Sequence, residues 1–105
     1  INAAAHITGG GLIENLLRSI PNNLTLNLDL SKIKVLKVFK WLKRQNISEN
    51  EMIRTFNCGV GFCIIVKRKN ILKIKSMFPR NFLPYEIGYI SKSSNKVKIS
   101  NSIKW

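Results

Sequence analysis

Three consecutive glycines between an apolar run and a helical pattern are the feature of this sequence best suited to chemistry. Gly9, Gly10 and Gly11 follow the apolar segment 3–7 and lead into a helix expected over 12–20. Glycines let backbone N–H groups approach a ligand closely, and a helix N-terminus favours negative charge. The turn therefore suits a phosphate group. Because it matches neither a dinucleotide fingerprint nor a P-loop, a flexible connection between strand and helix is an equal alternative.

Several polar residues could complete such a pocket. His6 lies beside the glycine turn, where a structural role and a functional role are equally supported. Asn15 and Arg18, three residues apart on the expected helix, could offer an amide and a cation to a phosphate. The run 54–61 is a second polar segment that leads into an expected strand, and its glycines permit close contact by a ligand or another backbone. Its simpler interpretation is tight sheet packing, with Asn57 in a turn.

Groups that could make or break bonds are few. The five acidic residues form no carboxylate pair, because Glu49 and Glu51 diverge on a helix and Asp29 occupies a capping position. One histidine and two separated cysteines do not give a zinc-site spacing, so we expect no metal. Cys58 and Cys63 lie in one strand-like run and point to opposite faces, and we expect buried free thiols in a reducing compartment.

The elements that must position these residues alternate along the chain. Strands are expected over 3–7, 24–28, 58–66, 85–90 and 96–99. Helices are expected over 12–20, over 32–45, after a Ser48 cap, and over 71–78 after an Asn70 cap. The most apolar strand, 58–66, is predicted to be central and buried on both faces. The order predicts a single α+β domain over 1–105, with helices packed against a mixed β-sheet.

The strong positive charge has two explanations. A net charge of +13 and a pI near 10.3 are typical of proteins that meet nucleic acid, anionic membranes or anionic metabolites. However, Lys far exceeds Arg, and Ile and Asn are abundant, which is the pattern that an A/T-rich genome imposes. We therefore expect the lysines of 32–45 to form a solvated face, with no specific nucleic-acid partner.

The chain has no apolar run near the ~20 residues of a membrane span, and its first residues lack a secretory signal. A cytoplasmic location without a membrane partner is expected. The chain begins at Ile1 and enters a strand-like run at once, which indicates a piece of a longer protein.

Two motifs of the sequence belong together. The first is Ala-His-Ile-Thr-Gly-Gly-Gly at 5–11 with Glu-Asn at 14–15, and the second is Met-Ile-Arg-Thr-Phe-Asn-Cys-Gly-Val-Gly at 52–61. In their order and separation they resemble phosphoribosylformylglycinamidine cyclo-ligase, the aminoimidazole ribonucleotide synthetase of purine biosynthesis. Pro21 falls where the family closes its first helix, and Glu-Ile-Gly at 86–88 is similar to its late strand. The glycine turn alone would fit other members of the superfamily, whereas the Arg-Thr-Phe-Asn run favours the cyclo-ligase.

The resemblance implies that the chain is the latter part of the family's C-terminal domain, without the N-terminal ATP-binding domain. The complete enzyme would be a homodimer that uses Mg-ATP to convert formylglycinamidine ribonucleotide to aminoimidazole ribonucleotide, ADP and phosphate. This piece would hold the ribonucleotide, bind no cofactor alone and be inactive alone, with His6 as the one catalytic candidate. The candidate substrate- and phosphate-binding residues are His6, Thr8, Gly9, Gly10, Gly11, Asn15, Arg18, Arg54 and Asn57.

Three alternatives stay open. A small basic nucleic-acid-binding module would lose affinity steeply as the salt concentration rises, because its phosphate contacts release counterions. Another member of the same ATP-dependent superfamily would carry the glycine turn but take a different substrate. A gene remnant would have no present activity.

Overall fold

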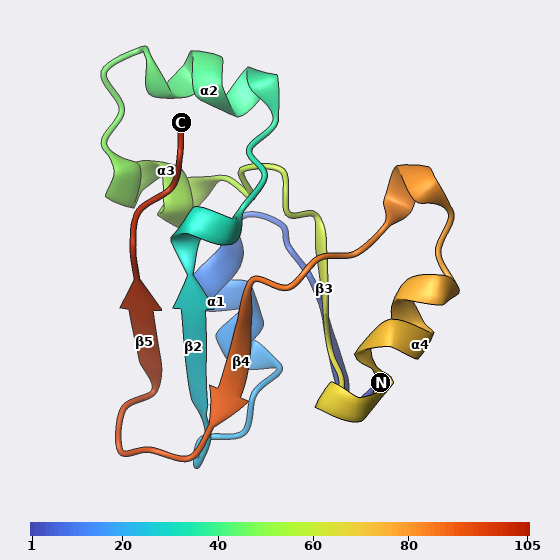
Figure 1. Ribbon diagram of the computed structural model, residues 1–105. Coiled ribbons are helices and arrows are strands. Elements are labelled where there is room, and N and C mark those ends of the chain that lie inside the picture. Colours follow the sequence, from blue (N-terminus) through green and yellow to red (C-terminus); the bar gives the residue numbers. More distant parts are fainter.

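The computed structural model describes residues 1–105 and has an α+β fold, as predicted (Figure 1). Its strands are β1 (Ala3–His6), β2 (Thr25–Asp29), β3 (Phe62–Ile65), β4 (Gly88–Ser91) and β5 (Val97–Ser100). Its α-helices are α1 (Gly11–Arg18), α2 (Lys37–Lys43), α3 (Glu49–Thr55) and α4 (Ile71–Ser76). Short 3-10 turns cover Leu30–Lys32, Arg68–Asn70 and Arg80–Phe82. None of the helices is both long enough and apolar enough to cross a membrane.

The strands form two sheets rather than one. The larger sheet has the order β4-β2-β5, with β2 antiparallel to β4 and parallel to β5, so the predicted mixed sheet is confirmed. The smaller sheet pairs β1 with β3 in antiparallel register, with Ala5 opposite Cys63. In Figure 1, α1 passes behind the larger sheet, and α4 lies beyond the smaller one.

The core lies between the larger sheet and the helices α1 and α3. Leu26 and Leu28 alternate with polar residues along β2 and are buried, as their period of two predicts. Leu16 of α1 and Met52 of α3 are buried in the same cluster. The contact between α1 and α3 is important for the site, because it sets the position of the segment that precedes α1.

The prediction of a central strand over 58–66 is wrong. The strand β3 has four residues in a two-stranded sheet, and its Phe62 side chain is 62% exposed. The preceding residues form a turn, in which Asn57 Oδ1 accepts a hydrogen bond from the Gly59 amide at 2.8 Å. Cys58 has a left-handed backbone there, with φ of 54°. The Asx turn therefore interrupts the apolar run before it can extend as one strand.

The predicted helix over 32–45 is shorter in the structure and covers only α2. Asp29 caps the preceding 3-10 turn, as expected of a capping residue, since its Oδ1 accepts from the Ser31 amide at 3.0 Å. The chain then runs extended, because Ile33 is buried in the core and the Lys34 amide donates to the Tyr85 hydroxyl at 3.0 Å. These anchors prevent the amphipathic pattern from forming a continuous helix.

The two remaining predicted caps have different outcomes. The Ser48 hydroxyl accepts from the Glu51 amide at 3.2 Å at the start of α3, which confirms that cap. Asn70 makes no side-chain capping bond to α4. Asn70 is the last residue of a 3-10 turn that continues directly into α4. A helical turn therefore already precedes the first amides of α4.

Both cysteines are free, with Cys58 buried and Cys63 half-buried. Burial raises the pKa of Cys63 to about 11, and burial together with the nearby Glu49 carboxylate raises the pKa of Cys58 to about 11. The structure therefore keeps both thiols neutral at physiological pH.

We expect slow alkylation of both thiols at pH 8. A pKa of about 11 in place of 9.0 lowers the thiolate fraction about a hundredfold. The rate of iodoacetamide modification, followed by mass spectrometry of the intact chain, should rise about tenfold per pH unit until unfolding intervenes. The neutral thiols stabilise the fold below pH 9, and this contribution declines between pH 9 and 11. Modification at the rate of an unfolded control at pH 8 would contradict the prediction.

Candidate functional site

The glycine turn connects β1 to α1 and leaves two backbone donors free. Thr8 and Gly9 are exposed, and Gly10 has a left-handed φ of 99°. The Gly11 amide donates to the Thr8 carbonyl at 3.2 Å, whereas the amides of Gly9 and Gly10 make no hydrogen bond within the chain. No side chain caps α1. The start of this helix therefore offers N–H groups to a negatively charged ligand.

Gly11 fixes this turn against α3. A Cβ atom at Gly11 would stand 1.9 Å from the Ile53 carbonyl oxygen and 2.8 Å from that of Arg54, so only glycine fits. By contrast, a Cβ atom at Gly9 would meet no atom within 4 Å. Gly9 and Gly11 thus have different roles, because Gly11 makes a close backbone contact and Gly9 borders open space.

A cleft of about 540 Å³ lies beside the turn, between α1, α3 and the end of β5. Gly10 and Arg54 both line it, so the structure brings Arg54 close to the glycine turn. The Arg54 side chain is 75% exposed and forms an ion pair with Glu51 of the same helix. Glu14 and Glu49 also line the cleft. The cleft is therefore mixed in charge, with its cation on α3.

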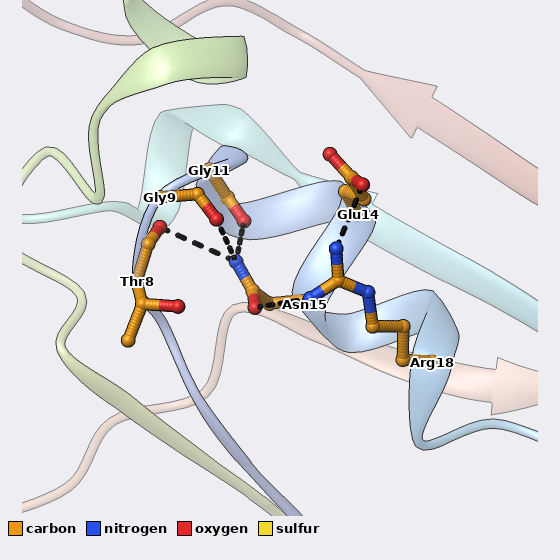
Figure 2. A network of polar contacts seen from close by, with 6 residues as sticks. All are labelled: Thr8, Gly9, Gly11, Glu14, Asn15 and Arg18. Atoms are coloured by element: carbon orange, nitrogen blue, oxygen red, sulfur yellow. Dashed lines mark hydrogen bonds and ion pairs between the residues drawn. The ribbon is translucent and has the colours of Figure 1, made fainter.

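Asn15 lies beneath the turn and holds its carbonyl groups, as Figure 2 shows. Its side-chain Nδ2 is 2.6 Å from the Gly11 oxygen, 3.3 Å from the Thr8 oxygen and 3.5 Å from the Gly9 oxygen. Asn15 is 7% exposed. The donors that we predicted for a phosphate are thus engaged by the turn itself.

Arg18 and Glu14 extend this network along the surface of α1 (Figure 2). Arg18 Nη2 lies 2.8 Å from Glu14 Oε1, and Arg18 Nη1 donates to Asn15 Oδ1 at 3.3 Å. The Arg18 side chain is 62% exposed, so it keeps access to solvent while it orients Asn15. The ion pair has the four-residue spacing of a helix surface pair, a signal that is present in the sequence.

Of the nine predicted site residues, only Gly10 and Arg54 line the cleft. His6 is exposed at the end of β1, with its ring centroid 6.3 Å from that of Phe62. Asn57 uses its side-chain oxygen in the turn before β3, which is the simpler of its two predicted roles. The structure has no group of three or more His, Cys, Asp or Glu residues that could hold a metal ion. The site is thus a backbone turn with a nearby arginine.

The family model described as AIR synthase related protein, C-terminal domain, matches residues 1–100. The chain belongs to this family. Curated relatives support the same assignment to the AIR synthase C-terminal domain and confirm the resemblance predicted from the two motifs. The phosphoribosylformylglycinamidine cyclo-ligase of Staphylococcus epidermidis is 41% identical over 97 residues, which are 90% of this chain and 28% of that protein.

Two other relatives are much longer than this chain. The trifunctional purine biosynthetic protein adenosine-3 of Chironomus tentans is 51% identical over 72 residues, 68% of this chain and 5% of that protein. Its human counterpart of the same name is 38% identical over 109 residues, 99% of this chain and 11% of that protein. The chain therefore spans 28% or less of these relatives.

Proposed function

We propose that this chain is the substrate-holding part of a phosphoribosylformylglycinamidine cyclo-ligase. The whole enzyme would convert formylglycinamidine ribonucleotide and ATP to aminoimidazole ribonucleotide, ADP and phosphate in purine biosynthesis. The proposal is supported by family membership and by a relative of that name that is 41% identical over 90% of the chain. A homodimeric state of the whole enzyme and a cytoplasmic location belong to the same proposal.

The role that we assign to this chain is to bind the ribonucleotide phosphate at the Thr8–Gly11 turn. The observation that carries this role is the pair of amides at Gly9 and Gly10 that make no hydrogen bond within the chain, with open space at Gly9 and the Glu14 carboxylate beside Gly10. Backbone donors fixed in this way bind an oxyanion without reorganisation. Arg54, on the other side of the cleft, would add a positive charge for the phosphate.

We assign binding of Mg-ATP to the N-terminal domain that the resemblance implies, and not to this chain. The contribution of the chain is to position the substrate and to stabilise charge, which can account for a large share of an enzyme's rate.

Gly9→Ala is expected to weaken binding of formylglycinamidine ribonucleotide about tenfold, with the stability of the chain unchanged. The added methyl group meets no protein atom, so the fold tolerates it, but it occupies the space through which the phosphate reaches the amides. Binding can be followed by NMR through the amide shifts of Gly9 and Gly10. Gly61→Ala is the matched control, because a Cβ atom there also meets nothing within 4 Å.

The two variants separate the proposed role from a general effect of removing a glycine. Equal affinities in Gly9→Ala and Gly61→Ala would refute a phosphate site at the turn. Weaker binding in Gly9→Ala alone supports it, provided that urea denaturation gives both variants the stability of the parent chain.

A further inference from the structure

We propose that Asn15 is a positioning residue that turns the amides of Gly9 and Gly10 toward the phosphate without touching the phosphate itself. The inference rests on the proposed function of the turn. It changes the role that the sequence indicated for Asn15, from a ligand contact to a support beneath the turn.

The argument begins with the geometry of the peptide unit. In a trans peptide, the C=O and N–H groups of one plane point in opposite directions. The Thr8 carbonyl shares its plane with the Gly9 amide, and the Gly9 carbonyl shares its plane with the Gly10 amide. No cis peptide bond is present in the chain. Anchoring these two carbonyls on one side of the turn therefore directs both amides to the other side.

Asn15 provides that anchor from the buried side. Its Nδ2 reaches the carbonyl oxygens of Thr8, Gly9 and Gly11, and the side chain is 7% exposed. Without this donor, the Thr8 oxygen would keep its bond from the Gly11 amide, but the Gly9 oxygen would lose its donor and would be free to rotate toward the anion site, where it would repel a phosphate. The Asn15 side chain thus keeps a carbonyl oxygen away from the phosphate and holds the Gly9 and Gly10 amides toward it.

Arg18 determines which end of the Asn15 amide faces the turn. The guanidinium donates to Asn15 Oδ1 at 3.3 Å and is itself held by Glu14 at 2.8 Å. If the amide rotated by half a turn, Oδ1 would face three carbonyl oxygens and Nδ2 would face the guanidinium. Both sides would then be repulsive, so the network permits a single orientation.

Asn15→Asp tests the inference, because it keeps the shape of the side chain and removes its donors. An ionised carboxylate accepts hydrogen bonds only, so it would repel the turn carbonyls. We expect at least about tenfold weaker binding of inorganic phosphate and of formylglycinamidine ribonucleotide. Before any ligand is added, we also expect shifted and broadened NMR signals for the Gly9 and Gly10 amides, with the β4-β2-β5 signals unchanged. Asn22→Asp, at an exposed loop position, is the control for added charge.

The spectra of the unliganded chain separate failure of this inference from failure of the proposed function. Unchanged Gly9 and Gly10 signals in Asn15→Asp would overturn the positioning role, even if phosphate binds at the turn. If these two signals change in Asn15→Asp but the parent chain binds no phosphate, the positioning role is supported and the phosphate site is refuted.

Arg18→Met provides a second variant in case Asn15→Asp does not fold. Arg18 is exposed, and methionine keeps its apolar stem, so the fold is retained while Asn15 Oδ1 loses its donor. We expect a smaller effect in the same direction, about threefold on phosphate affinity, with the same two amide signals displaced. Parent-like affinity and spectra in Arg18→Met would contradict the orienting role of the guanidinium.

Discussion

Gly11→Ala is expected to destabilise the chain by roughly 3 kcal/mol or more, the largest effect of any single substitution in the glycine turn. The φ of Gly11 is 79°, a left-handed value that costs other residues about 1–2 kcal/mol. Its Cβ atom would also overlap the Ile53 carbonyl oxygen at 1.9 Å, so α1 and α3 would have to separate. Overpacking of this kind costs about 1–3 kcal/mol. Urea denaturation followed by circular dichroism measures the sum.

Gly9→Ala is the matched control for Gly11→Ala, because it adds the same methyl group two residues earlier. A Cβ atom at Gly9 has open space around it, so we expect a stability change within about 0.5 kcal/mol. Equal losses in the two variants would show that the turn needs glycine for flexibility alone. A Gly11→Ala chain as stable as the parent would contradict the close contact between α1 and α3.

This contrast shows how far the sequence could be used at the turn. The order of strand, glycines and helix was predictable, because the apolar period changes on either side of the glycines. The different roles of Gly9 and Gly11 were not predictable, because the two residues are chemically identical in the sequence. It depends on where α3 packs, and α3 begins 38 residues after Gly11.

Local patterns predicted elements well where no distant contact competed with them. The alternation along β2 and the Ser48 cap of α3 are as expected. The segment after β2 differs because Ile33 is buried in the core and the Tyr85 hydroxyl holds the Lys34 amide. Tyr85 lies 51 residues away in the chain, so helical periodicity alone could not reveal this constraint.

Part of the network around Asn15 could be predicted from the sequence. An asparagine four residues after Gly11 is in reach of the Gly11 carbonyl, and local side-chain bonds of this kind are common near turns. Glu14 and Arg18 have the spacing of a helix ion pair. The bonds from Asn15 back to Thr8 and Gly9 could not be foreseen, because they depend on the left-handed backbone of Gly10 and Gly11.

The isolated chain is expected to form no aminoimidazole ribonucleotide from ATP and formylglycinamidine ribonucleotide. Ring closure with loss of phosphate needs groups that move protons, and the chain keeps no acidic side chain free for this task. His6 is exposed and forms no ion pair with a carboxylate. The acidic residues are engaged as follows: Glu14 with Arg18, Asp29 with Ser31 and Asn101, Glu49 with the Ile103 amide, Glu51 with Arg54 and Thr55, and Glu86 with Lys75 at 4.0 Å.

The assay should be run on chain that has been shown to be folded and to bind phosphate at the turn, with product measured by mass spectrometry. The full-length cyclo-ligase of Staphylococcus epidermidis is the positive control, because it contains the segments that this chain does not span. Turnover by the isolated chain would refute its dependence on those segments. Phosphate binding without turnover is the expected result, since backbone amides at a glycine turn can hold a substrate but cannot accept or donate the protons of ring closure.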